Sequence, residues 1–213
     1  MPPGGSPGRV IGAITGWRAG RPGPLVVAID GHGAAGKSTI AAAVAAATGA
    51  ALVHTDDFFV APPRPSLAPP RPSLAPPRPP LPPRGLAGYY DWRRLRAEAL
   101  VPLRARHAAS FRRFDWERGG GLAGTVVVEP CDLIVVEGVF SAAPELSDLV
   151  DRSVFVDTAE AERLRRLRLR VAPDEWDDEW LAAERAYFEL ARAPSSFDLV
   201  VPGTRRARQV SAR

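Results

Sequence analysis

The stretch Leu25–Ser38, LVVAIDGHGAAGKS, decides how this chain folds. A short apolar run rich in β-branched residues, Leu25–Ile29, leads into Gly31–Ser38, which matches the pattern G-x-x-x-x-G-K-[ST] in full. An alanine-rich segment with strong helix propensity, Lys37–Thr48, follows and stops at Gly49. A buried strand, a glycine-rich turn and a helix in this order predict a phosphate-binding loop, or P-loop.

Each residue type in this loop has a physical task. The glycines let backbone N–H groups point at phosphate oxygens, and the helix N-terminus adds the positive end of its dipole. Lys37 is expected to reach the β- and γ-phosphates of a nucleoside triphosphate and Ser38 to bind Mg²⁺, with Thr39 as the alternative hydroxyl. His32 is expected to line the loop without a chemical role. The predicted nucleotide contacts are Gly31, His32, Gly33, Ala34, Ala35, Gly36, Lys37, Ser38 and Thr39.

Composition narrows the range of ligands. The chain has 213 residues and a net charge of +4, but 27 of its 28 basic residues are arginine and Lys37 is its single lysine. This bias is typical of a GC-rich genome, so the high pI is no argument for nucleic-acid binding, and no nucleic-acid partner is expected. The sequence also lacks asparagine, which excludes the N-K-x-D motif that reads guanine.

Short apolar runs and low cysteine content predict a cytoplasmic protein without a membrane partner. The runs are five to seven residues long, far below the roughly 20 that span a bilayer. Met1–Gly8 does not have the pattern of a secretory signal. The single cysteine, Cys131, suits a reducing compartment.

Strand and helix patterns alternate along the chain, which predicts a doubly wound α/β fold with a parallel sheet in one domain, 1–213. Strands are expected at Leu25–Ile29, Ala51–His54, Thr125–Val128, Leu133–Val136, Val154–Val156 and Phe197–Val201. Helices are expected at Arg9–Trp17, Lys37–Thr48, Asp91–Arg106, around Pro144–Val150, Ala159–Val171 and Asp174–Arg192. Residues 205–213 are expected to form a flexible tail.

A proline-rich segment, residues 62–84, interrupts this pattern. It repeats the heptad PPRPSLA and holds 12 of the 23 prolines, so it is expected to be disordered or polyproline II. A partner with an aromatic groove could dock on its PxxP motifs. The exact repetition favours the other interpretation, a surface loop lengthened by repeat expansion at little cost in closure entropy.

Acidic and basic side chains that could complete a phosphate site follow the predicted strands. Asp56 and Asp57 come after one strand and Glu137 after another, where the crevice of a parallel sheet lies. Glu137 resembles the acid that binds Mg²⁺, and the alternative for it is a solvated acid at a strand end. For Asp56 and Asp57 the alternative is an N-cap or turn role. Arg163 and Arg166 share one helical face and could neutralise the transferring phosphate, or simply form a solvated basic face.

Six segments together resemble the uridine kinase-like family of P-loop small-molecule kinases, which includes phosphoribulokinase and bacterial pantothenate kinase. The segments, between about Val26 and Gly203, are VVAIDGHGAAGKST, HTDDFF, YYDW, FRRFDW, DLIVVEGVF and VFVDTAEAERLRRLRLR. The resemblance implies a P-loop NTPase fold, a three-layer α/β/α arrangement with a parallel sheet and a short helical lid. It also implies that ATP and Mg²⁺ are the cofactors.

The resemblance also implies residue roles. Asp56 would lie near the acceptor hydroxyl and Mg²⁺, Glu137 near Mg²⁺, and Arg163 and Arg166 in the lid. With Lys37, these give the expected catalytic residues Lys37, Asp56, Arg163 and Arg166 and the metal ligands Ser38, Glu137 and Asp56. The substrate contacts expected from the same segments are Asp57, Tyr90, Asp91, Phe114 and Trp116.

Departures from the family pattern concern the acceptor. The His-Pro that would follow Asp91 is Trp92-Arg93, and the base-reading tyrosine and histidine are Phe114 and Gly119. Because a phenyl group cannot hydrogen-bond a pyrimidine, uridine itself is not supported. The sequence therefore predicts an ATP-dependent phosphotransferase acting on a hydroxyl of a small molecule, such as a nucleoside. The alternative is a nucleotide-dependent ATPase or switch that regulates a protein partner.

Overall fold

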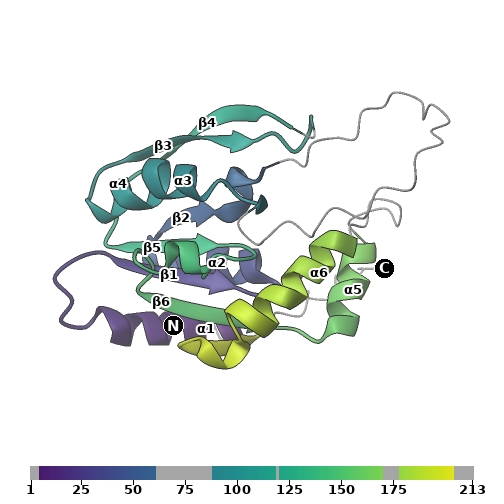
Figure 1. Ribbon diagram of the computed structural model, residues 1–213. Coiled ribbons are helices and arrows are strands. Elements are labelled where there is room, and N and C mark those ends of the chain that lie inside the picture. Colours follow the sequence, from purple (N-terminus) through teal and green to yellow (C-terminus); the bar gives the residue numbers. More distant parts are fainter. Residues whose placement is uncertain (1–4, 61–87, 119, 170–177, 204–213) are drawn as a thin grey trace, which may run out of the picture.

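Five parallel strands form the centre of the molecule (Figure 1). The structure, a computed structural model, describes residues 5–60, 88–118, 120–169 and 178–203. The strands lie side by side in the order β2-β5-β1-β6-β7, so the chain starts in the middle of the sheet and crosses over on both sides. Their bounds are β1 Leu25–Asp30, β2 Ala51–His54, β5 Leu133–Glu137, β6 Arg152–Asp157 and β7 Leu199–Pro202.

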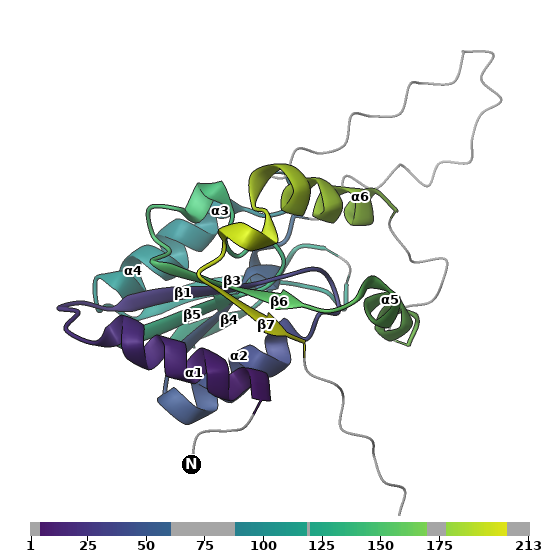
Figure 2. The same cartoon turned by 90° about the horizontal axis from the view of Figure 1, so that it is seen from below.

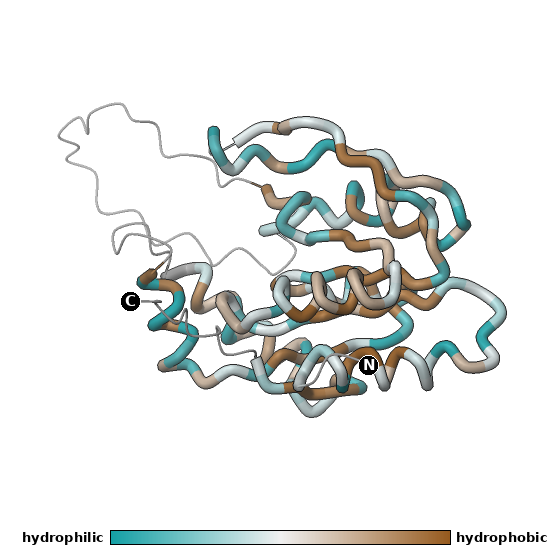
Figure 3. Tube along the Cα trace, turned by 180° about the vertical axis from the view of Figure 1, so that it is seen from behind, coloured by the Kyte–Doolittle hydropathy of each residue, from teal (hydrophilic) through white to brown (hydrophobic). Residues whose placement is uncertain are grey.

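Helices cover both faces of the sheet, which gives the three layers expected for the fold (Figure 2). On one face, α1 (Gly5–Arg18) and α2 (Lys37–Thr48) pack against apolar residues of β1, β5 and β6. On the other face lie the helical segment 92–104 and the C-terminal helix that begins with α6 (Asp178–Ala186). Because both faces are buried, β1 and β5 are apolar along nearly their whole length, as the hydropathy colouring shows (Figure 3).

A two-stranded antiparallel hairpin stands apart from the sheet. It pairs β3 (Ala109–Phe114) with β4 (Leu122–Val128) and lies beyond the helical segment 92–104 in Figure 1. The apolar run Thr125–Val128 is thus a strand, as expected, and it pairs with β3 rather than with a strand of the parallel sheet. β3 escaped prediction because its sequence, ASFRRF, places arginines on the exposed face of a strand that is buried on one side only.

Most of the predicted helices form, but their bounds differ from the expected ones and some contain π-helical stretches. Asp91–Arg106 corresponds to α3 (Trp92–Arg94), a π-helical stretch (Leu95–Leu100) and α4 (Val101–Arg104). Around Pro144–Val150 only a 3-10 turn forms, Pro144–Leu146, so the predicted helix there was wrong. The remaining elements are the 3-10 turns Thr55–Phe58 and Pro194–Ser196, α5 (Glu160–Arg168) and the π-helical stretch Tyr187–Ala191 that continues α6.

Some predicted features lie outside the described residues. They include the proline-rich segment 62–84, the tail 205–213 and the junction between the two predicted lid helices. Their assignments stay predictions. Within the part of the chain that the structure describes, no helix is both long enough and apolar enough to cross a membrane.

Candidate active site

The P-loop connects β1 to α2 through backbone conformations that favour glycine. Gly31 has φ +145°, and a Cβ atom there would lie 2.7 Å from the carbonyl oxygen of Val156 in the neighbouring strand. Gly36, which precedes α2, has φ 103° and no side chain to accept the N–H groups of the first helical turn. These N–H groups are therefore left for an anion.

Lys37 lies inside the loop rather than in solvent. Its side chain is buried, and Nζ donates hydrogen bonds to the carbonyl oxygens of Gly31 at 2.8 Å and His32 at 2.9 Å. A compact ammonium group fits between these carbonyls, whereas the planar fork of arginine would need more room. The lysine therefore places a positive charge beside the amides of the first helical turn.

Ser38, Glu137 and His54 form a connected polar group beside the loop. The Ser38 hydroxyl donates to Glu137 Oε2 at 3.2 Å, and His54 Nδ1 lies 2.6 Å from Glu137 Oε1. The parallel register places His54 directly opposite Glu137, at the carboxyl ends of β2 and β5. Hydrogen bonding to Glu137 raises the pKa of His54, although burial alone would lower it.

A hydroxyl and a carboxylate fit the needs of Mg²⁺. This ion usually keeps several waters and binds one or two carboxylates together with substrate phosphates, so a protein cage is not required. The described residues contain no cluster of three or more histidines, cysteines or acids that could hold a metal ion. Ser38 and Glu137 would hold Mg²⁺ next to the loop.

The adjacent acids Asp56 and Asp57 face different surroundings. Tyr90 donates a hydrogen bond from its hydroxyl to Asp56 Oδ1 at 3.1 Å, and Lys37 is the cation that most favours a charged Asp56. Burial also raises the pKa of Asp57, and the cations that oppose this rise are His54, which acts on Asp56 too, and Arg113 of the hairpin. Asp56 is open to solvent on one side, yet crowding by protein atoms raises its pKa. The structure thus turns Asp56 toward the P-loop and Asp57 toward the hairpin.

Asp91 has a local structural task. Its Oδ1 accepts a hydrogen bond from the backbone N–H of Arg94 at 3.1 Å and so caps α3. Its own N–H donates to the carbonyl oxygen of Phe58 at 2.8 Å, which ties this helix to the turn that carries Asp56. The predicted contact between Asp91 and a substrate stays a prediction.

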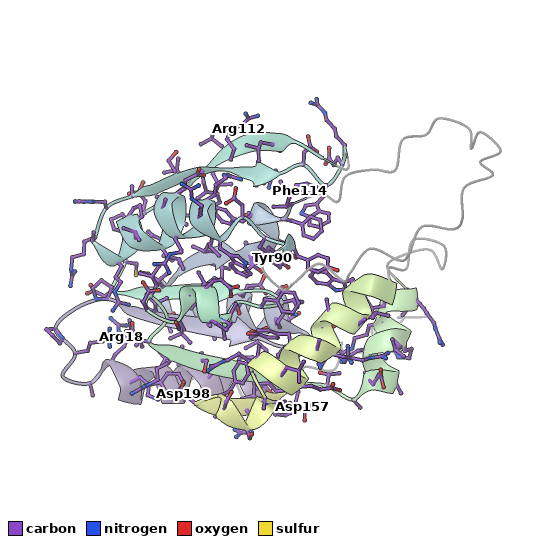
Figure 4. All side chains as sticks on the ribbon, in the orientation of Figure 1. Arg18, Tyr90, Arg112, Phe114, Asp157 and Asp198 are labelled. Carbon is purple, nitrogen blue, oxygen red and sulfur yellow. The ribbon has the colours of Figure 1, made fainter. Side chains whose placement is uncertain are left out.

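Aromatic side chains from the hairpin, from residues 59 and 90 and from α6 gather in one cluster. Phe59 is its centre, and its ring lies between 4.9 and 6.2 Å from the rings of four others, measured between centroids. Figure 4 shows Phe114 on the hairpin and Tyr90 below it, nearer the sheet. Trp116 is 55% exposed, so a ligand has access to its ring. We call this set the aromatic cluster: Phe59, Tyr90, Phe114, Trp116 and Trp180.

The two arginines predicted for the lid, on α5, both reach the P-loop region. Arg166 donates from Nη1 to the carbonyl oxygens of Ala34 at 3.1 Å and Ala35 at 3.3 Å. Arg163 is 7% exposed, and its Nε and Nη1 atoms have no hydrogen-bond partner. Its Nη1 lies 3.8 Å from a carboxylate oxygen of Glu184. Burial lowers the pKa of Arg163.

Sequence reasoning missed two buried acids, Asp30 and Glu184. Asp30, at the end of β1, accepts hydrogen bonds from the N–H groups of Gly31, Phe140 and Ala142 and from the Tyr187 hydroxyl. It therefore ties the start of the P-loop to two distant segments. An acid that closes a wholly apolar strand was the available signal. Glu184 gave no such signal, because it looks like an ordinary polar residue of a helix.

Comparisons with known sequences give one partial match. No protein-family model matches the chain. A stretch of 80 residues is 34% identical to a uridine kinase of Halobacterium salinarum and covers 37% of this chain and 35% of that relative. The match thus spans about a third of the relative's length.

Solved structures match over nearly the whole chain. One described as a possible uridine kinase from Bacillus stearothermophilus has a TM-score of 0.62 at 20% identity, covering 90% of this chain and 96% of its own. D-glycerate 3-kinase from Cryptococcus neoformans has a TM-score of 0.62 at 14% identity, covering 97% and 98%. The predicted resemblance to the uridine kinase-like P-loop kinases is confirmed.

In this uridine kinase-like fold, the residues predicted for phosphate and metal come together at one edge of the sheet. Lys37, Ser38 and Glu137 meet at the carboxyl ends of β1 and β5, and Asp56 follows the end of β2. Thr39 is exposed on the first turn of α2. His32, expected to have no chemical role, contacts Glu184 at 3.2 Å. The solved neighbours show the fold alone, so substrate and chemistry must be argued from these residues.

Proposed function

We propose that this protein is an ATP-dependent phosphotransferase that moves the γ-phosphate of ATP to a hydroxyl of a small molecule. The observation that carries the proposal is the convergence of a P-loop lysine, a Ser38–Glu137 pair and Asp56 at one edge of the sheet. A loop that only binds nucleotide does not need an acid with a raised pKa beside it. The kinase names of the matching proteins agree with this proposal.

Each group would have a separate task in the transfer. Lys37 and the amides at the start of α2 would bind the phosphates, and Mg²⁺ held by Ser38 and Glu137 would neutralise charge on their oxygens. Asp56 would orient the acceptor hydroxyl and take its proton. Its raised pKa makes it a better base than an ordinary aspartate, because proton transfer is most efficient when the pKa of the base approaches the working pH.

The aromatic cluster supports an acceptor with a planar ring, with a nucleoside as the first candidate. Trp116 offers an accessible face, and Phe114 and Phe59 form an apolar wall behind it. Stacking on aromatic rings accepts many bases and needs no hydrogen bond to the base edge. The acceptor would therefore be held mainly by stacking of its ring, while Asp56 would orient its hydroxyl.

The test is a screen for ADP release with nucleosides, pantothenate and sugar acids as acceptors. The matched pair Asp56→Asn and Asp57→Asn then separates two neighbouring carboxylates. We expect Asp56→Asn to lower kcat by about 10²–10⁴-fold with the best acceptor, because it removes the base. Asp57→Asn should mainly raise KM for the acceptor. Equal turnover by Asp56→Asn and the wild type would rule out the proposed role of Asp56.

A further inference from the structure

The side chain of Glu184 contacts the P-loop with its carboxylate. It lies on α6 and is 1% exposed. The backbone N–H of Gly33 faces both of its oxygens, at 3.0 and 3.1 Å. The indole N–H of Trp180 donates to Oε1 at 2.6 Å, and His32 Nδ1 lies 3.2 Å from Oε2. A helix that follows the P-loop by some 150 residues in the chain thus supplies an anion to one of the loop's amides.

The surroundings of this carboxylate are those of a phosphate site. Burial alone would raise the pKa of Glu184, but the contact with His32 and the charge of Lys37 lower it, so it carries a negative charge. Arg163 approaches from α5 with Nε and Nη1 unpartnered, and its 3.8 Å distance to Glu184 is too long for a hydrogen bond. The Gly33 amide, the cation Lys37 and the unpartnered Arg163 atoms offer more donors than the two oxygens of one carboxylate can use. A phosphate group, which has more oxygens, fits this set of donors better.

We propose that Glu184 is an internal competitor of the nucleotide's terminal phosphates. It holds the Gly33 amide while the loop is empty and must leave when phosphate enters. The inference rests on the proposed function only in requiring that the loop binds phosphate. Two anions cannot share the Gly33 amide at low cost, since like charges repel strongly where water is excluded. When Glu184 leaves, the Nε and Nη1 atoms of Arg163 become available to the phosphate.

The same helix connects this exchange to the aromatic cluster. Trp180 and Glu184 are one turn apart on α6 and are joined by the indole hydrogen bond. The Trp180 ring also packs on Tyr89, with centroids 5.0 Å apart, and on Phe140 at 5.5 Å. Releasing the Glu184 carboxylate therefore breaks its hydrogen bond with the Trp180 indole, which would couple nucleotide binding to the aromatic cluster.

Titration calorimetry with inorganic tripolyphosphate and with ATP, each with Mg²⁺, tests the competition without requiring turnover. Glu184→Gln removes the charge but keeps an oxygen that accepts the Gly33 N–H, so the loop keeps its shape. We expect this variant to bind tripolyphosphate about tenfold more tightly than the wild type. The matched control is Glu189→Gln, an exposed glutamate further along the same helix, which should leave the affinity unchanged.

A second variant keeps the test valid if Glu184→Gln folds poorly. Trp180→Phe retains an aromatic ring in the cluster but loses part of the indole together with the N–H that holds the carboxylate, so it should tighten binding by about two- to fivefold. Affinity equal to or weaker than that of the wild type in both variants would overturn the inference, as would no binding by any of the proteins. Tighter binding without any phosphorylated acceptor would refute the proposed function and leave the competition standing.

Discussion

Gly31→Ala tests whether the P-loop depends on its close contact with the neighbouring strand. The new Cβ atom would lie 2.7 Å from the backbone carbonyl oxygen of Val156, at a φ of +145° that side chains rarely adopt. Strain at such a backbone position costs about 1–3 kcal/mol, and the shift needed to relieve the overlap costs about another 1–3 kcal/mol. We therefore expect the free energy of unfolding to fall by about 2–6 kcal/mol.

The assay is urea unfolding followed by tryptophan fluorescence and circular dichroism, with Gly12→Ala as the matched control. Gly12 is an exposed residue within α1, and nothing lies within 4 Å of a Cβ atom placed there. That variant should gain about 0.5–1 kcal/mol from better helix propensity, so the same chemical change is predicted to have opposite signs at the two positions. A Gly31→Ala protein as stable as the wild type would refute the steric argument.

Three further predictions concern the groups around the site. Tyr187→Phe removes the 2.8 Å hydrogen bond to Asp30 and should lower the free energy of unfolding by about 1 kcal/mol in the same assay. Trp116→Ala should raise KM for a ring-bearing acceptor by about tenfold with little change in kcat, and an unchanged KM in steady-state kinetics would remove the ring from the acceptor site. Because the pKa of His54 is raised in the folded protein, its contribution to stability is fully present below pH 6.5 and is lost as the pH rises through the folded value. The stability difference between wild type and His54→Gln, measured by urea unfolding, should accordingly shrink from pH 6 to pH 9, and a constant difference would argue against the Glu137 contact.

The fold could be predicted because its signals are local. The P-loop, its flanking strand and helix, and the apolar strands are each encoded by a continuous stretch, and Gly49 ends α2 as its position suggested. The hairpin was harder to predict because the pairing of Ala109–Phe114 with Leu122–Val128 is determined by which face packs on the helical segment 92–104. Around Pro144, the backbone turns after one short 3-10 segment, although the residues that follow are compatible with a helix.

Site residues could be predicted where they directly follow a strand of the sheet. Those carried by a helix that packs against the site from a distant part of the chain could not. Glu137 and Asp56 come after β5 and β2, and parallel strands bring their carboxyl ends to one edge. Glu184 approaches the loop only because α6 packs across the sheet, a tertiary contact that leaves no trace in local sequence. Asp30 could have been noticed as a charge at the end of an apolar strand, but two of its three backbone donors, Phe140 and Ala142, come from a segment that only the fold brings close.

The central claim is that phosphate is transferred to a hydroxyl, and ³¹P NMR of the reaction mixture tests it most directly. With ATP, Mg²⁺ and the acceptor that gives most ADP release, the wild type should produce a phosphate monoester signal equal in amount to the ADP formed. Lys37→Ala, which removes the ammonium group held by Gly31 and His32, should produce none. Inorganic phosphate as the only product with every acceptor, or a monoester signal undiminished in Lys37→Ala, would contradict the account.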